Sequence, residues 1–196
     1  MSHYYTDNSQ LASNPRSFDY YFDNEKFIFT TDNGVFCKEN VDYGSYLLIK
    51  NTFRQALGNR LLDLGCGWGP VGIIIKRFNP DIEVTAVDVN LRAVQLTNLN
   101  AVQNKTLIKA CLCTDILTLN LLFDSIILNP PIRAGKVVIY DLYDKAYHTL
   151  RENGSLYIVI QKKQGASSSV NKLSELFKTV TVLDREGGYW VIQAIK

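Results

Sequence analysis

The 196-residue sequence has few of the residues that mark metal centres, disulfide frameworks or membrane spans. It holds two histidines and four cysteines, and the cysteines form no C-x-x-C pair. Cys111 and Cys113 have strand spacing in an apolar stretch, so we expect buried thiols there, with no zinc and no disulfide. No run approaches the ~18 apolar residues of a membrane helix, and the N-terminus lacks the apolar core of a signal peptide. We therefore expect a cytoplasmic protein.

The sequence also has little net charge. It holds 21 Lys and Arg against 19 Asp and Glu, and the resulting +2 neither predicts nor excludes nucleic-acid binding. Its length fits one domain with a short extension and allows a full α/β core. The content of 46% hydrophobic and 20% charged residues is typical of a globular protein. Composition thus indicates a globular protein, and the function has to be inferred from sequence motifs.

The sequence does have a glycine-rich turn between two apolar segments, Leu61 to Gly72, which reads L-L-D-L-G-C-G-W-G-P-V-G. Glycines at 65, 67 and 69 leave no side chains in the turn, which predicts a strand, a tight turn and a helix. The start of such a helix offers unpaired N–H groups and the positive end of its dipole, so a nucleotide-like cofactor fits. Asp63, just before the first glycine, suits a cationic ligand better than a pyrophosphate. The alternative is a tight turn that binds no ligand.

This block resembles motif I of the class I S-adenosylmethionine-dependent methyltransferases. Their ligand carries an ammonium and a sulfonium group and no phosphate, in agreement with the position of Asp63. The resemblance implies S-adenosylmethionine as the cofactor. It also implies cofactor contacts from the turn, from later strand ends and from a covering loop, at Phe36, Asp63, Gly65, Cys66, Gly67, Gly69, Asp88, Val89, Asp115, Ile116 and Asn129.

Apolar strands alternate with helical segments on both sides of this turn. We expect strands at 61–64, 83–87, 106–111, 123–128 and 156–161, and helices at 46–57, 71–78, 91–100 and 137–150. The tail predicts a short helix at 170–177 and a strand pair at 180–183 and 189–195. The alternation predicts a Rossmann-like, doubly wound α/β fold, with a mainly parallel sheet and ligands outside the carboxyl ends of the strands. The tail matches the seven-stranded methyltransferase variant of this fold.

The first 58 residues read as additions to that core. We expect a flexible N-terminus at 1–17, then an aromatic β-hairpin, a cofactor-covering loop and a helix within 18–58, and the methyltransferase core at 59–196. Phe18–Phe22 and Phe27–Thr31 form the two hairpin strands. Their aromatic rings either pack on the domain or form a platform for stacking bases or a partner.

Acidic or amide residues follow successive predicted strands. Asp88 lies just over 20 residues beyond the first glycine, where a carboxylate can accept hydrogen bonds from both ribose hydroxyls. Asp115 can accept from an adenine amino group, with Ile116 beside the ring. Asp63 would act on the methionine ammonium through water or backbone. The alternative for each aspartate is an exposed position in a loop.

Asn129-Pro130-Pro131-Ile132 follows the strand predicted at 123–128. Two prolines make a stiff extended corner, in which the Asn129 side-chain oxygen and the Pro130 carbonyl can be held as paired acceptors. Such a pair suits an exocyclic amino group, because two N–H···O bonds turn its lone pair toward the sulfonium methyl. Positioning and electrostatics would then carry the rate without a strong base. The run resembles motif IV of amino-group N-methyltransferases, although a purely structural turn is the alternative.

Three local motifs resemble the "methyltransferase small" group, which is related to ribosomal RNA guanine-N2 methyltransferases of the small subunit. They are N-P-P-I-R-A-G-K at 129–136, T-D-N-G-V-F at 31–36 and Q-K-K-Q-G-A at 161–166. The resemblance implies that Asn129 and Pro130, with Pro131 and Ile132, hold the target amino group. It further implies RNA-backbone contacts from the basic residues Arg133, Lys136, Lys162 and Lys163.

Two departures bear on the substrate. Ile132 stands where many relatives have an aromatic residue that stacks on a flipped base. Two-domain relatives also carry a degenerate second methyltransferase copy, which this sequence lacks.

The leading hypothesis is N2-methylation of a guanine in small-subunit (16S) ribosomal RNA, with the ribosomal RNA or the small subunit as partner, no membrane partner, and a monomer or weak dimer. A second hypothesis keeps the enzyme but changes the acceptor to a protein glutamine or a small amine. A third is a non-catalytic RNA-binding or assembly protein with the same fold. A NAD-dependent oxidoreductase is disfavoured by Asp63, the N-P-P corner and the tail.

Overall fold

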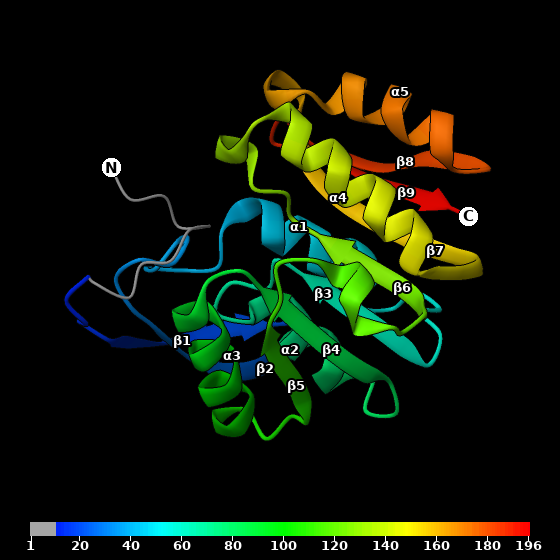
Figure 1. Cartoon of the computed structure of the whole chain (residues 1–196). Coiled ribbons are helices and arrows are strands. Elements are labelled where there is room, and N and C mark those ends of the chain that lie inside the picture. Colours follow the sequence, from blue (N-terminus) through cyan, green and yellow to red (C-terminus); the bar gives the residue numbers. More distant parts are fainter. Residues whose placement is uncertain (1–10) are drawn as a thin grey trace.

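The computed structural model describes residues 11–196, so most of the segment predicted to be flexible lies outside the described residues. Its centre is a seven-stranded sheet in the order β5-β4-β3-β6-β7-β9-β8 (Figure 1). The first five strands of this order are parallel, whereas β9 runs antiparallel to both β7 and β8. This confirms the predicted fold class and the strand pair at one edge. The strands are β3 (Arg60–Leu64), β4 (Glu83–Asp88), β5 (Ile108–Leu112), β6 (Phe123–Leu128), β7 (Leu150–Gln161), β8 (Thr179–Glu186) and β9 (Tyr189–Ile195).

Helices cover both faces of this sheet and create two apolar cores. One core joins α1, α2 and α3, and the other joins α4, α5 and the 3-10 turn η1. The three isoleucines at 73–75 are fully buried in the first, and Tyr143 in the second. The helical elements are α1 (Tyr43–Thr52), α2 (Pro70–Phe78), α3 (Leu91–Gln103), α4 (Lys136–Thr149) and α5 (Ala166–Leu176), with the 3-10 turns η1 (Ile116–Leu119), η2 (Ile132–Ala134) and η3 (Lys162–Gln164).

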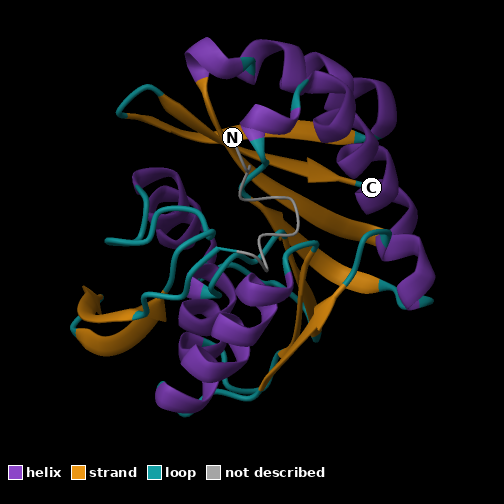
Figure 2. Cartoon of the chain, turned by 60° about the vertical axis from the view of Figure 1, so that its left-hand side comes forward, coloured by secondary structure: helices purple, strands orange, loops and turns teal. Residues whose placement is uncertain are grey.

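The predicted hairpin is present as β1 (Arg16–Phe22) and β2 (Glu25–Thr31), outside the large sheet and beside the helices (Figure 2). Asp23 and Asn24 form its turn with φ values of 47° and 65°, as a tight right-twisted hairpin requires. Two asparagines of the α3 region then bond the free edge of β2: Asn104 Oδ1 accepts from Ile28 N at 2.9 Å, and Asn100 Oδ1 from Thr30 N at 2.7 Å. The hairpin is thereby fixed to the domain.

The hairpin aromatics are core residues. Phe22 packs edge-on against Phe53 at 5.0 Å between ring centroids, and Phe29 against Trp68 at 5.1 Å. Phe27 is also buried, whereas Tyr21 is 66% exposed. The structure therefore favours the packing interpretation over the stacking platform, and the hairpin and the sheet share one core.

Helix α1 differs from its prediction at both ends. The predicted range was 46–57, but the helix starts at Tyr43 because the Asp42 carboxylate accepts the N–H groups of Gly44 and Ser45, at 3.0 and 3.2 Å. It ends at Thr52, with Phe53 as the C-cap whose N–H still donates to the Ile49 carbonyl and whose ring packs against Phe78. Tyr43 to Ser45, which precede the predicted helix, thus belong to α1.

Three further boundaries shift for local reasons. Strand β7 starts at Leu150 and not at 156, because positive φ at Asn153 (61°) lets the chain continue through a register shift against β6. Helix α5 starts at Ala166 and not at 170, after Gly165 with φ of 107° ends η3. Helix α3 runs to Gln103, three residues beyond its prediction, and its amide-bearing end holds the hairpin.

Candidate active site

A cavity of about 530 Å³ lies at the carboxyl ends of β3, β4 and β6. The loops after these strands line it, together with the segment before α1 and the residues where β7 ends and β9 begins. Ligands of doubly wound sheets bind at this edge. The predicted site residues at its wall are Phe36, Asp63, Gly65, Cys66, Gly67, Asp88, Val89, Ile116, Asn129, Pro130, Pro131, Ile132 and Arg133. Those outside the wall are Gly69, Asp115, Lys136, Lys162 and Lys163.

The glycine-rich turn presents backbone to this cavity. The N–H groups of Gly65 and Cys66 both donate to the Val87 carbonyl in β4, at 2.8 and 2.9 Å. Gly65 and Gly67 have φ values of 72° and 59°, and a Cβ at either position would meet no atom within 4 Å. Conformation, not crowding, therefore requires glycine here. The open space beside the turn lets a ligand approach the backbone closely.

Asp63 is a buried carboxylate inside β3, one residue before the strand ends. It is 4% exposed, and its Oδ2 accepts the N–H of Gly72 in the first turn of α2 at 2.9 Å. Burial raises the pKa of Asp63 to about 7, against the effect of the Gly72 hydrogen bond and with a smaller contribution from the Asp88 charge. The carboxylate thus ties α2 to β3 through the backbone, and a cation bound in the cavity would favour its ionised form.

Asp88 closes the turn from the side of β4. Its Oδ2 accepts the N–H of Gly67 and its Oδ1 accepts the N–H of Asn90, both at 2.9 Å. Burial raises the pKa of Asp88, while these backbone hydrogen bonds favour the carboxylate. The side chain lies at the cavity wall, so its remaining lone pairs can accept hydroxyl groups there.

After β5, Ile116 lies at the cavity wall and Asp115 does not. Ile116 is 3% exposed and lines the cavity. The Asp115 carboxylate instead caps η1 by accepting Leu117 N at 3.1 Å, and Lys145 Nζ lies 3.5 Å from its Oδ1. Lys145 also contacts Asp141 at 2.9 Å, and both of these residues line the cavity. The adenine role of Asp115 stays a prediction, and Ile116 is the better placed of the pair.

The N-P-P corner follows β6 and leads to α4 (Figure 1). Pro131 N-caps the 3-10 turn η2, where its carbonyl accepts Ala134 N at 2.9 Å. The side-chain nitrogen of Asn129 is held by Ser45 Oγ at 3.0 Å and by the Asp42 carboxylate oxygens at 3.3 and 3.4 Å. With its nitrogen engaged in this way, the amide presents its oxygen as the acceptor.

The segment between β2 and α1 borders the cavity with Val35, Phe36 and Cys37. Trp68 Nε1 of the glycine-rich turn donates to the Phe36 carbonyl at 2.9 Å. Arg92 Nη1 donates to the Asn33 carbonyl at 2.7 Å. The predicted covering loop is therefore fastened to the turn and to α3, with the Phe36 ring 43% exposed.

Basic residues surround the N-P-P side of the cavity. Arg133 lies at the wall, and Lys136, Lys162 and Lys163 are exposed just beyond it. The Lys136 ammonium lies 5.0 Å from the centre of the Tyr140 ring. The geometry therefore allows contacts to a polyanion around the cavity mouth.

Sequence reasoning missed several wall residues. Asp42 and Ser45 reach Asn129 from the start of α1, and an aspartate before an apolar helical run is a helix-start signal that could have indicated Asp42. Gln161 and Tyr189 come together through the pairing of β7 with β9, which local sequence does not reveal. Within residues 11–196, the buried Oε1 of Gln161 accepts no hydrogen bond.

The cysteines are free thiols, and the structure corrects one expectation about them. Cys66 is buried, but Cys111 and Cys113 are half-buried because β5 is an edge strand and Cys113 lies beyond its end, at the cavity wall. Across residues 11–196, no cluster of three or more His, Cys, Asp or Glu side chains could hold a metal ion. None of the helices described is long and apolar enough to cross a membrane.

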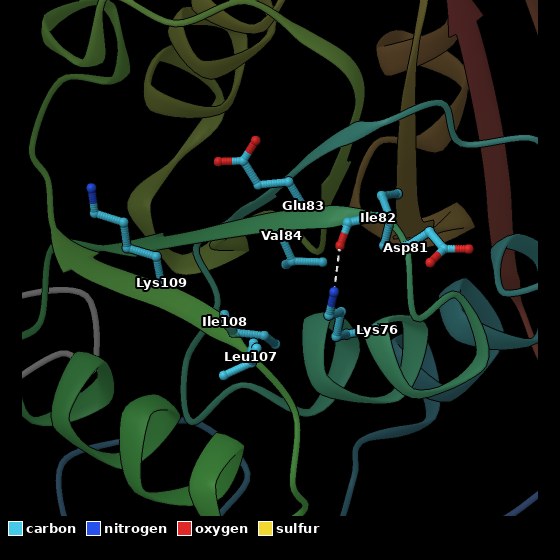
Figure 3. Close-up of a pocket in the computed structure, with 8 residues that line it drawn as sticks. All are labelled: Lys76, Asp81, Ile82, Glu83, Val84, Leu107, Ile108 and Lys109. Atoms are coloured by element: carbon cyan, nitrogen blue, oxygen red, sulfur yellow. Dashed lines mark hydrogen bonds between the residues drawn. The ribbon is translucent and has the colours of Figure 1, made fainter.

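A second, shallower hollow of about 410 Å³ lies at the opposite ends of β4 and β5 (Figure 3). Its Lys76 donates to the carbonyls of Pro80 and Ile82, both at 2.7 Å. The adjacent Arg77 pairs with Glu25 at 3.2 Å. These charged groups make contacts within the fold, whereas most of the predicted site residues lie at the first cavity.

The family model for the methyltransferase small domain matches residues 26–193, nearly the whole chain. The chain belongs to the methyltransferase small domain family. The resemblance inferred from the three motifs is thereby confirmed, and the cavity is the candidate active site of a methyltransferase.

Curated relatives of this methyltransferase include proteins named for ribosomal RNA methylation. It is 41% identical over 198 residues to the uncharacterized protein YbxB of Bacillus subtilis, covering 99% of this chain and 98% of that one. It is 31% identical over 176 residues to the ribosomal RNA small subunit methyltransferase C of Photorhabdus laumondii, covering 88% of this chain and 51% of the relative. The chain thus spans about half the length of that named methyltransferase.

Among solved structures, this methyltransferase is similar to a Thermus thermophilus enzyme described as the 16S rRNA N2 G1207 methyltransferase in complex with S-adenosylmethionine and guanosine. The TM-score is 0.82 at 25% identity, over 93% of this chain and 50% of that one. A methyltransferase from Pyrococcus furiosus, at 20% identity and a TM-score of 0.65, shares the fold.

Proposed function

We propose that this methyltransferase uses S-adenosylmethionine to methylate an exocyclic amino group in ribosomal RNA, namely the N2 amino group of a guanine in the small subunit. Family membership and the relatives named for ribosomal RNA methylation support the reaction and the RNA class. The Thermus enzyme, with its bound guanosine, supports the base. The chain spans about half the length of those named relatives.

One end of the cavity suits the cofactor, and we call it the cofactor end: Asp63, the turn Gly65 to Gly69, and Asp88. The open backbone at Gly65 and Gly67 leaves space for the methionine portion. Asp88 would accept the ribose hydroxyls, and the raised pKa of Asp63 fits a carboxyl group that a bound ammonium would ionise. Phe36 would cover the cofactor from the segment before α1.

The observation that carries the proposal is the fixed amide of Asn129. With Nδ2 bonded to Ser45 and Asp42, Oδ1 is left to accept an N–H of the target amine, and the Pro130 carbonyl supplies a second acceptor. Two such bonds direct the nitrogen lone pair toward the methyl carbon. Bound S-adenosylmethionine would supply the methyl group, with the C–S electron pair left on sulfur as the N–C bond forms, and the methylated nitrogen would then lose one proton to solvent.

The test is transfer of labelled methyl from S-adenosylmethionine to four acceptors: small ribosomal subunits, naked ribosomal RNA, transfer RNA and total protein. We expect label in ribosomal RNA or in the subunits, and none with Asn129→Ala. Label confined to protein would favour the glutamine alternative. Tight cofactor binding without transfer to any acceptor would favour the non-catalytic alternative.

A further inference from the structure

Asn129 is held by two residues that are far from it in the sequence: Asp42, which N-caps α1, and Ser45 in the first turn of α1. Its Nδ2 lies 3.0 Å from Ser45 Oγ, 3.3 Å from Asp42 Oδ1 and 3.4 Å from Asp42 Oδ2. A primary amide can turn by 180° and exchange its donor and acceptor ends. An ionised carboxylate only accepts hydrogen bonds, so only one of the two orientations satisfies Asp42.

We infer that Asp42 is a positioning residue for methyl transfer, which fixes the Asn129 amide with its oxygen toward the acceptor amine. This inference rests on the proposed function of Asn129. In the reversed orientation, the NH2 group of Asn129 would meet the N–H groups of the amine, and no hydrogen bond could form. Asp42 therefore selects the orientation in which Oδ1 can receive the amine.

The charge of Asp42 adds an electrostatic effect. During transfer, positive charge would move from the sulfonium to the amine nitrogen. An N–H of that amine donates a hydrogen bond to Asn129 Oδ1. A carboxylate on the far side of the amide polarises it, which makes Oδ1 a stronger acceptor for the increasingly acidic N–H. The interaction is therefore stronger in the transition state than in the ground state, so it acts on turnover.

The position of Asp42 is itself fixed by the fold. Its Oδ1 also accepts the N–H groups of Gly44 and Ser45, and α1 packs against β7 and β9. The carboxylate and the Ser45 hydroxyl thus move as one unit with the helix start. Asp42, Ser45 and Asn129 all lie at the wall of the same cavity.

Asp42→Asn is the decisive substitution, because asparagine caps a helix as well as aspartate and has nearly the same size. It removes the charge and allows either amide orientation at Asn129. We expect kcat on ribosomal RNA to fall about tenfold to hundredfold. We expect the S-adenosylmethionine affinity and the melting temperature to stay close to wild type. Ser45→Ala should lower kcat about threefold to tenfold, because Asp42 still fixes the amide.

Two further measurements separate positioning from a general structural effect. Asp81→Asn removes an exposed carboxylate outside the cavity and should leave kcat unchanged. The side-chain NH2 resonances of Asn129, assigned by comparison with Asn129→Ala, should shift in Asp42→Asn and not in Asp81→Asn.

The outcomes distinguish this inference from the proposed function. If Asn129→Ala is inactive and Asp42→Asn keeps wild-type kcat, the inference is wrong and the role of Asn129 survives. If Asn129→Ala itself turns over normally, the proposed function is wrong. A loss of cofactor affinity equal to the loss of kcat in Asp42→Asn would also overturn the positioning role.

Discussion

The two ends of the cavity are assembled in opposite ways. The cofactor end comes from one short stretch of chain between Asp63 and Asp88, and its carboxylates bond backbone N–H groups of the adjacent turn and helix. The opposite end, which we call the acceptor end, consists of Asn129 to Ala134 with Asp42, Ser45 and Gln161, and Lys136 lies just outside its wall. These residues come from three distant parts of the sequence. Neighbouring residues thus define one end, and tertiary packing defines the other.

The ends also differ in exposure. At the cofactor end, Asp63 and Cys66 are buried and the turn is anchored to β4. At the acceptor end, the corner continues into a three-residue 3-10 turn, and Arg133 and Lys136 are exposed. An end built on buried, hydrogen-bonded carboxylates suits a small ligand of fixed shape, and an exposed basic end suits a polymer. Substitutions at the two ends should therefore change different measured quantities.

The largest expected effect is at the acceptor end. Asn129→Ala removes the acceptor that orients the amine, so we expect kcat to fall at least about 10²-fold. S-adenosylmethionine affinity by calorimetry should stay within about twofold of wild type. Asn98→Ala, at an exposed position on α3, is the matched control. Wild-type turnover in Asn129→Ala would show that the acceptor end does not control turnover.

The next effect is at the cofactor end. Asp88→Ala deprives Gly67 N and Asn90 N of their partner and removes the predicted ribose acceptor. We expect cofactor affinity to fall about tenfold to hundredfold, since an unpaired buried donor and a lost charged hydrogen bond add together. Calorimetric titration measures this directly, with Asp81→Ala as the control. An unchanged dissociation constant would refute the assignment of Asp88.

RNA binding should respond only at the acceptor end. Lys162→Ala with Lys163→Ala removes two exposed charges beside the cavity. We expect about tenfold weaker binding to ribosomal RNA and a salt-dependence slope lower by about 1 to 2, with kcat at saturating RNA unchanged. The control is Lys109→Ala with Lys178→Ala, which removes two exposed lysines away from this cavity. An equal loss of affinity in the control would mean that the charge effect is not local.

A further expected effect, on stability rather than on activity, is a pH dependence at Asp63. Its folded pKa of about 7 lies above the ordinary 3.8, so the folded protein without cofactor holds the proton more tightly than the unfolded chain. The free energy of unfolding should therefore decrease as pH rises from about 4 to about 7, and Asp63→Asn should flatten that decrease. Urea unfolding at several pH values measures it. A steeper pH dependence in the variant would contradict the sign.

Cofactor binding should show the opposite trend at the same residue. A bound ammonium favours ionised Asp63, so S-adenosylmethionine affinity should rise about threefold to fivefold as pH increases through about 7. Asp63→Asn should lose this part of the pH dependence. If the affinity of both proteins for S-adenosylmethionine has the same pH dependence, the cofactor charge does not affect the ionisation of Asp63.

The cofactor end was largely predictable from sequence, because its requirements are local. Three glycines, an apolar strand and Asp88 at its spacing predict the turn, and β4 at Glu83–Asp88 starts where it was predicted. The inward position of Asp63 was not predicted. Its burial depends on the contact with Gly72 and on the helix that packs over β3.

The acceptor end was predictable only in part. Proline stereochemistry predicts the N-P-P corner from the sequence. No local sequence pattern predicts which residues contact Asn129. The helix predicted at 46–57 leaves Asp42 outside it, and the role of Asp42 at Asn129 requires α1 to pack beside β7 and β9. Likewise Gln161 meets Tyr189 only through the pairing of β7 with β9, a contact that no local pattern encodes.

The most direct measurement is nucleoside mass analysis of small ribosomal subunits after incubation with the wild-type protein and S-adenosylmethionine, beside the same reaction with Asn129→Ala. The proposed function predicts N2-methylguanosine with the wild type and none with the variant. N6-methyladenosine, or N2-methylguanosine in equal amounts with both proteins, would contradict it.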